Sequence, residues 1–340
     1  MEPMGAHYRA QRAVPDGAAA VSAARQAAEP DGAAAGDVGP LAHAALFYSA
    51  LREYASAVGS FVTAGLRSRD AVMVAVPGTQ AEALRDFLGA DAEQVAFVDM
   101  AWLGRNPARI IPAIRAFAEA HPGQLVRYVG EPSWRSRSAA EQAEVMRHEA
   151  LLSLAFAGSE VCILCPYEAA LDQGVLAGAE RTHEALMRNG SWEPSRSYAG
   201  PGRVHRQDAP LPEPPAGLRV LTYREDPAAA RAFARDQARA AGLREPRLTD
   251  LVIAVGELAA NTLRHTSGTG TVRVWATALE VICEVHDSGH IRDALAGRRL
   301  PAADAGRGHG LWVVNQVCDL VEMRTGSGGT TFRLHIAVGD

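Results

Sequence analysis

The chain has 340 residues, of which 48% are hydrophobic and 21% are charged, and its formal net charge is -5. These values predict a soluble globular protein with room for two domains. The acidic balance argues against a general nucleic-acid-binding protein, which needs a basic face for phosphates. Since no apolar run reaches the length of a membrane span and the first residues lack the apolar core of a signal peptide, we expect no membrane insertion and a cytoplasmic location.

All 34 basic residues are arginine, because the sequence contains no lysine. This excludes a phosphate-binding lysine of the P-loop kind, a Schiff-base lysine and a catalytic lysine. Any contact to a phosphate group must therefore come from arginine, from backbone N–H groups or from a bound metal ion.

Two of the four cysteines, Cys162 and Cys165, form a C-x-x-C motif inside the apolar run 161–165. This run reads as a strand, and residues three apart on a strand point to opposite faces. The two thiols therefore cannot bind the same metal ion, and no second pair completes a zinc site. We interpret all four cysteines as reduced core residues.

The first 39 residues are rich in Ala, Gly and Pro, which predicts a disordered tail without chemistry. From residue 40 to 189, short apolar runs alternate with helical patterns, as expected for a parallel sheet with helices on both faces. The expected strands are 71–76, 95–98, 125–129 and 161–165. The expected helices are 79–88, 107–120, 138–157 (which opens with a capping box) and 169–188.

The loop after the first of these strands, Pro77–Gln80, decides whether this domain is an ATPase. Ligands of parallel sheets bind beyond the carboxyl ends of the strands. The loop has no lysine and too few glycines for a P-loop. We therefore predict an α/β domain without a functional P-loop.

Residues 190–217 are rich in proline and lack apolar periodicity, which predicts a stiff linker. A second domain is expected at 218–340. Its expected strands are 218–221, 272–275, 281–286 and 330–336, and its expected helices are 227–241, one around Glu257 and one from Leu311. Helices on one face of a mixed sheet predict an α/β sandwich.

The helix at 256–265 (GELAANTLRH) carries the first candidate site residues. Glu257, Asn261 and His265 are spaced four apart and share one stripe. A neighbouring stripe suited to a core contains Leu251, Val255, Leu258 and Thr262. A carboxylate and an amide one turn apart can bind hydrated Mg²⁺ or a reacting hydroxyl, although the same spacing also occurs on solvated helix faces.

Three later features favour a site over a solvated face. Asp287 and Gly289 directly follow the strand 281–286, and Thr330 or Thr331 opens the last strand. The glycine-rich loop before the helix that starts at Leu311 contains Gly306, Arg307, Gly308 and Gly310. Glycine lets a backbone approach a ligand closely, and N–H groups leading into a helix can hold phosphates.

The first domain resembles the MEDS sensory domain, a RecA-like relative of the circadian-clock ATPases, over about residues 40–190. The segments that carry the resemblance are 43–48 (HAALFY), 130–134 (GEPSW), 147–150 (RHEA) and 165–168 (CPYE). The last motif usually ends in Asp, so Glu168 departs from it. We expect His43, Trp134 and Tyr167 to line a pocket for an unknown small-molecule or protein signal, or else to be packing residues.

The second domain resembles the GHKL nucleotide-binding fold, also named Bergerat fold, and within it the anti-sigma-factor serine/threonine kinases. The resemblance covers roughly residues 218–338 and implies ATP and Mg²⁺ as cofactors. It implies that Glu257 is the general base and that Asn261 coordinates Mg²⁺. It implies nucleotide contacts from Asp287, Gly289, Gly306, Arg307, Gly308, Gly310, Leu311 and Thr330.

The resemblance further implies a kinase that is gated by the sensory domain and phosphorylates a STAS-type anti-anti-sigma protein, with a sigma factor as a further partner. Two alternatives stay open. One is a sensor histidine kinase, although its dimerising two-helix hairpin does not fit the proline-rich linker and His148 matches the MEDS pattern instead. The other is a non-catalytic ATP-binding module that sequesters a sigma factor. The sequence also leaves open whether the chain forms a homodimer.

Overall fold

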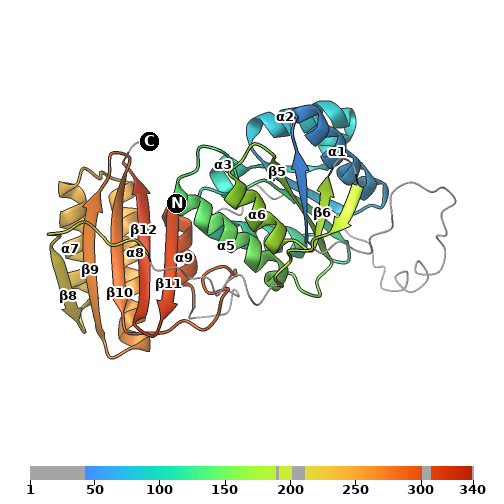
Figure 1. The fold of residues 1–340 in the computed structure, drawn as a ribbon. Coiled ribbons are helices and arrows are strands. Elements are labelled where there is room, and N and C mark those ends of the chain that lie inside the picture. The colour runs from blue at the N-terminus through green and yellow to red at the C-terminus, as the bar shows by residue number, and fades with distance from the viewer. Residues whose placement is uncertain (1–42, 189–190, 201–210, 301–307, 339–340) are drawn as a thin grey trace. The chain divides into compact units, whose positions relative to one another are not determined.

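The computed structural model describes residues 43–188, 191–200, 211–300 and 308–338. These residues form two α/β domains, which precede and follow the proline-rich segment in the sequence (Figure 1). The predicted tail 1–39 and residues 201–210 of the predicted linker lie outside the described residues. No helix in the described ranges combines the length and the apolarity needed to cross a membrane.

The first domain is built on a seven-stranded sheet with the order β3-β2-β4-β5-β1-β6-β7. Every strand pair is parallel except β6 with β7, which confirms the predicted parallel α/β domain. The strands are β1 (His43–Tyr48), β2 (Ala71–Val76), β3 (Ala96–Asp99), β4 (Val126–Gly130), β5 (Val161–Glu168), β6 (Ala185–Arg188) and β7 (Ser191–Pro194).

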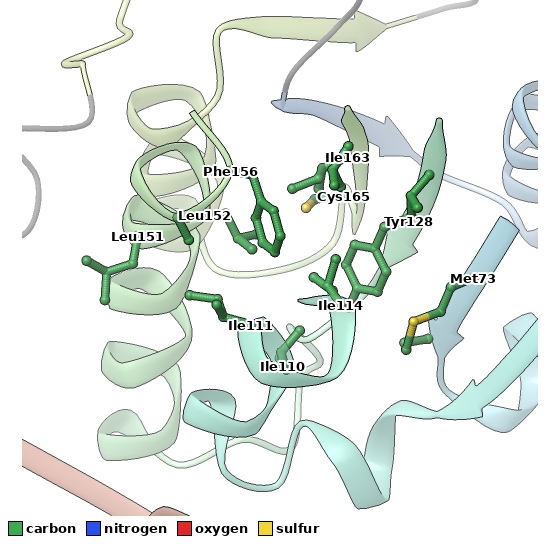
Figure 2. Packing of buried hydrophobic residues seen from close by; sticks show 14 of the residues in the cluster. Met73, Ile110, Ile111, Ile114, Tyr128, Leu151, Leu152, Phe156, Ile163 and Cys165 are labelled. Atoms are coloured by element: carbon green, nitrogen blue, oxygen red, sulfur yellow. The ribbon is translucent and has the colours of Figure 1, made fainter. Parts of the chain in front are cut away.

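Helices cover both faces of this sheet, and each face has its own core. The helices are α1 (Leu51–Arg67), α2 (Gly78–Leu88), α3 (Met100–Leu103), α4 (Ile110–Glu119), α5 (Ala139–Ala155) and α6 (Gln173–Thr182), with 3-10 turns η2 (Gly89–Gln94) and η3 (Pro107–Arg109). On one face, residues of α1 and α2 pack against alternate residues of β1 and β2. On the other face, Figure 2 shows Ile110 and Ile114 of α4 and Leu152 of α5 around Tyr128 and Cys165 of the sheet.

The helix predicted at 169–188 is wrong in its second half. Helix α6 ends at Thr182, and residues 185–188 form strand β6 instead. Ala185 and Leu186 pair with Ala44 and Ala45 of β1, so burial in the sheet outweighs the local helical pattern. Strand β7 extends the sheet into residues 191–194, which the sequence assigned to the linker. Strand β1 and helix α1 were not predicted.

The second domain has a five-stranded sheet with the order β11-β12-β10-β9-β8. Its strands are β8 (Val220–Arg224), β9 (Thr269–Ala276), β10 (Glu280–Asp287), β11 (Leu320–Gly326) and β12 (Gly329–Ala337). Its helices are α7 (Pro227–Ala240), α8 (Arg247–His265) and α9 (Gly310–Val317). All pairs are antiparallel, so the expected mixed sheet is wrong, while the α/β sandwich is confirmed.

Helices α7 and α8 pack on the same face of this sheet (Figure 1). The apolar residues on one side of each helix share a buried core with Val272 of β9, Cys283 of β10 and Leu334 of β12. Strand β11 was not predicted, because its polar residues Glu322 and Arg324 interrupt the apolar pattern of a core strand.

The sheet also carries a buried charge cluster. The His335 ring contacts Glu280 through Nδ1 at 3.1 Å and Glu322 through Nε2 at 3.0 Å. Burial opposes the charge on this ring, but the hydrogen bonds to the two carboxylates raise the pKa of His335 from 6.5 to about 9. The imidazolium is therefore the form that stabilises the folded domain near neutral pH.

We expect His335→Gln to lower the thermal midpoint of the protein most strongly at or below pH 6. The protonated ring contributes its full stabilisation below the ordinary histidine pKa of 6.5 and loses it as the pH rises through about 9. The gap between wild type and variant in thermal scans should therefore shrink from pH 6 to pH 9.5. A gap that is constant across this range would show that the ring acts by packing alone.

Candidate active site

The second domain holds an open pocket of about 770 Å³ between α8, the end of β10, the start of α9 and β12. It brings together eight of the residues singled out from the sequence: Asn261, His265, Asp287, Gly289, Gly308, Gly310, Leu311 and Thr330. Its apolar walls come from Leu258, Val285, Ile291, Leu311 and Phe332. Gly306 and Arg307 lie outside the described residues.

The Asp287 carboxylate is held in a fixed orientation at the end of β10. Its Oδ1 accepts a hydrogen bond from the Gly289 N–H at 2.8 Å, and its Oδ2 accepts one from the Thr262 hydroxyl at 2.7 Å. The Tyr223 hydroxyl lies 2.8 Å from the Thr262 hydroxyl and extends this chain of hydrogen bonds. Each carboxylate oxygen has a second lone pair, so Asp287 can still accept a hydrogen bond from a ligand in the pocket.

Two glycines make room for this arrangement. Gly270 pairs with Tyr223 across the β8–β9 ladder, and a Cβ on Gly270 would lie 2.4 Å from the Tyr223 hydroxyl oxygen. Gly329, at φ +115°, opens β12, and a Cβ there would lie 2.0 Å from the Asp287 carbonyl oxygen. The sequence marked Gly270 as lying past a helix end and Gly329 as opening the last strand, but it gave neither glycine a role in the site. The signal for Thr262 was present, since it is the polar member of the predicted core stripe of α8.

Glu257 lies beside the start of α9. A Cβ on Gly310 would lie 2.6 Å from Glu257 Oε2 and 3.5 Å from Asn261 Nδ2. The absence of a side chain at Gly310 thus leaves the carboxylate and the amide next to the first residue of the helix. The spacing of Glu257 and Asn261 predicted their shared stripe, and the structure adds the position of this stripe beside Gly310.

The start of α9 also presents backbone donors. The first N–H groups of a helix have no partner within the helix, and no described side chain caps this one. The positive end of the helix dipole attracts an anion at the same place. Gly308, at φ +97°, adopts the left-handed conformation that glycine allows and lines the pocket just before the helix.

Thr330 lines the pocket but uses its hydroxyl to hold the loop after β10. It donates to the Gly289 carbonyl oxygen at 2.8 Å and lies 2.9 Å from the Thr325 hydroxyl. Thr325 in turn accepts from the Ile291 N–H at 3.1 Å. A ligand contact from Thr330 therefore stays a prediction, whereas its role in shaping the loop follows from these bonds.

The residues present fit a magnesium–nucleotide complex. The apolar walls and the Asp287 carboxylate suit a flat base with an exocyclic amino group. The Asn261 amide and the Glu257 carboxylate supply oxygen donors of the kind that Mg²⁺ prefers. The start of α9 suits the phosphate groups.

Among the described residues that line the pocket, the arginine is Arg264, an exposed residue one turn beyond Asn261 on α8. Its guanidinium group could contact a phosphate. Since the chain has no lysine, we expect Arg264→Ala to weaken ATP binding by about 1 kcal/mol, or about fivefold in Kd. Calorimetry with ATP and with adenosine should show the loss for ATP alone. Arg235→Ala, which removes an exposed arginine from α7, is the matched control. An equal loss for adenosine would contradict a phosphate contact.

The three residues of the predicted sensory pocket do not share one cavity. Trp134 lines a pocket of about 590 Å³. The Arg137 guanidinium stacks on its ring, with the Arg137 Cζ atom 3.7 Å from the Trp134 ring centroid. Tyr167 and His43 are fully buried, and each packs against His183, with ring centroids 5.7 and 4.0 Å away. The role of these three residues in sensing stays a prediction.

His148 is 1% exposed on α5, and burial lowers its pKa to about 3. A phosphoacceptor histidine needs an accessible ring nitrogen, which α5 does not provide. Of the segment between the two domains, residues 191–200 and 211–219 are described, and they contain no helix. The hairpin that a histidine kinase requires is therefore absent from these ranges.

Each of the two domains matches a known protein family. Residues 42–184 match the model of MEDS, the MEthanogen/methylotroph, DcmR Sensory domain. Residues 223–336 match the model of the histidine kinase-like ATPase domain. No curated protein gives a match to this chain.

Proposed function

Since the chain is a fusion of a MEDS sensory domain with a histidine kinase-like ATPase domain, we propose that it is a signal-transduction regulator whose second domain is an ATP-dependent serine/threonine protein kinase. The fusion itself supports a sensory protein with an ATPase or kinase-like output. The finer assignment rests on the pocket of the second domain.

The observation that carries the proposal is the position of Glu257 and Asn261 beside Gly310. A carboxylate close to the expected phosphate end of the pocket suits a general base for an incoming hydroxyl. A module that only binds ATP needs the adenine-binding carboxylate Asp287 and a metal site, but it does not need a general base. The presence of both carboxylates in one site therefore supports phosphoryl transfer.

Magnesium–ATP supplies the phosphoryl group and a divalent charge that stabilises it during transfer. Asp287 accepts a hydrogen bond from the adenine amino group, while the apolar walls exclude water from the base. Asn261 would hold the metal ion, and the N–H groups at the start of α9 would hold the phosphates. Glu257 orients the hydroxyl of the protein substrate and accepts its proton. The residues act chiefly by positioning and charge, so few of them do covalent chemistry.

The proposed substrate is a serine or threonine hydroxyl on a STAS-type anti-anti-sigma protein. This choice follows from the resemblance of the second domain to anti-sigma-factor kinases, which also motivates a sigma factor as a further partner. The MEDS domain would gate the reaction through its own small-molecule or protein signal. The cofactors are ATP and Mg²⁺.

The test is phosphoryl transfer from γ-labelled ATP by the full chain to STAS proteins of the same genome. The proposal expects acid-stable label on a STAS protein and a strict need for Mg²⁺. Acid-labile label on the chain itself would overturn it in favour of a histidine kinase. ATP binding without any label on the complete set of STAS proteins would favour the binding module.

A further inference from the structure

A second cluster of reactive side chains lies inside the first domain, away from any role in phosphoryl transfer. Four residues contribute it: His43 from β1, Glu149 from α5, Cys165 from β5 and His183 at the end of α6. One donor atom from each lies within 4.8 Å of all the others, and all four residues are at most 1% exposed. Figure 2 shows Cys165 in the packed interior of this domain.

The contacts outside the cluster fix how the two imidazoles face it. His183 Nδ1 lies 2.8 Å from the Ala179 carbonyl oxygen, which can only accept, so Nδ1 carries the proton of the neutral ring. His43 Nδ1 lies 3.0 Å from the Ser153 hydroxyl. Both Nε2 atoms therefore point inward, with a lone pair available on His183. Such outer hydrogen bonds are the usual way in which metal-binding histidines are oriented.

The inward-facing atoms are only partly satisfied by one another, since His43 Nε2 makes a hydrogen bond with Glu149 Oε2 at 3.2 Å. His183 Nε2 is 3.3 Å from Glu149 Oε2, but the two do not make a hydrogen bond. Glu149 Oε1 also finds no hydrogen-bond partner among the described residues. A buried lone pair facing a buried carboxylate is costly unless a positive charge lies between them.

We propose that His43, Glu149, Cys165 and His183 bind one divalent transition-metal ion of the zinc class in the core of the sensory domain. Zinc bonds of 2.0–2.3 Å in a tetrahedron place neighbouring ligand atoms about 3.3–3.8 Å apart. The separations from His43 Nε2 to Glu149 Oε2 and to Cys165 Sγ are 3.2 and 3.5 Å. These distances, with the 3.3 Å between His183 and Glu149, already approach that geometry.

The chemistry of the donors selects the metal. A thiolate and two imidazoles favour zinc and related ions over Mg²⁺ and Ca²⁺, which prefer oxygen. One carboxylate and one thiolate neutralise the charge of a divalent ion, so the loaded site can stay buried without a net charge. Binding takes the proton from the Cys165 thiol and releases it to solvent as the sulfur–metal bond forms.

Cys162 provides the matched control. It lies three residues before Cys165 on β5, is only half-buried and points to the other face of the strand. The predicted separation of the two thiols thus holds, but Cys165 becomes a ligand of a site built from other elements, which the C-x-x-C pattern alone could not reveal.

The experiment uses the full chain, purified without a polyhistidine tag, stripped with a chelator and titrated with Co²⁺ or Zn²⁺. We expect one ion per chain by mass spectrometry of metals and, with Co²⁺, a thiolate charge-transfer band with strong tetrahedral d–d absorption. Cys165→Ser should abolish the charge-transfer band, and Cys162→Ser should leave it unchanged. Glu149→Gln, which keeps the side-chain shape, should lower metal affinity at least tenfold.

Two results would overturn the proposal. One is a wild-type chain that retains no stoichiometric Zn²⁺ or Co²⁺, which would leave the cluster as a hydrogen-bonded core. The other is a cobalt band that survives Cys165→Ser. Circular dichroism and ATP binding of each variant show whether it is folded, so loss of metal in a folded Glu149→Gln chain remains informative. The outcome does not depend on whether the second domain is a kinase.

Discussion

Replacing Glu257 with alanine is expected to stop phosphoryl transfer while Mg–ATP stays bound. The side chain lies beside Gly310 at the start of α9, where the proposed reaction places the substrate hydroxyl, but it does not line the pocket walls proposed to hold the adenine base. Loss of a general base costs about 10²- to 10⁴-fold in rate. The measurement is single-turnover transfer to a STAS substrate, with ATP affinity determined in parallel by calorimetry.

Asp236→Ala is the matched control for this variant, because it removes an exposed carboxylate from α7, a helix that does not line the pocket. Its transfer rate and ATP affinity should equal those of wild type. If Glu257→Ala keeps a wild-type transfer rate, the carboxylate is not the base. If it loses ATP binding as well, its role is in holding the metal or the nucleotide.

Asp287→Ala should have the largest effect on binding. A hydrogen bond to a charged carboxylate contributes about 1.5–3 kcal/mol, so the Kd for ATP should rise about 10- to 150-fold. If the carboxylate accepts from the adenine amino group as proposed, wild type should reject GTP, whose oxygen at that position cannot donate. In Asp287→Ala this preference should largely disappear. Competition binding with ATP and GTP measures both quantities.

Asp293→Ala tests whether any carboxylate of the same loop would do. Asp293 is exposed, and it does not line the pocket. Its Oδ2 pairs with the exposed Arg299, and its Oδ1 accepts a hydrogen bond from the Leu295 N–H at 3.0 Å, so its removal should change neither the affinity for ATP nor the preference for adenine. An Asp287→Asn chain keeps an acceptor oxygen and should fall between wild type and Asp287→Ala. If Asp287→Ala keeps the wild-type preference for ATP over GTP, the adenine base does not bind at Asp287.

Much of this site was predictable from local sequence. The spacing of Glu257 and Asn261 fixes their shared stripe on a helix, and Asp287 follows a strand whose alternation is clear. Gly310 was predicted to lead into a helix, where backbone N–H groups can hold phosphates. These features depend on neighbours within a few residues, which is why they could be predicted before the fold was known.

The remaining features depend on contacts between distant elements. Tyr223 reaches Asp287 through Thr262 only because β8 pairs with β9 opposite Gly270. Strand β6 was mistaken for helix because the residues of β1 with which it pairs lie 141 positions earlier in the sequence, as for Ala185 and Ala44. The His43–Glu149–Cys165–His183 cluster draws one residue from each of four elements, so no spacing in the sequence signals it.

The most direct test of the central claim is the identity of the phosphorylated residue after reaction of the full chain with Mg–ATP and its STAS partner. Mass spectrometry under neutral conditions, which preserve phosphohistidine, can detect every kind of phosphorylated residue at once. The account predicts phosphoserine or phosphothreonine on the STAS protein and none of the chain's 11 histidines modified. Phosphohistidine on this chain, with the STAS protein unmodified, would contradict it.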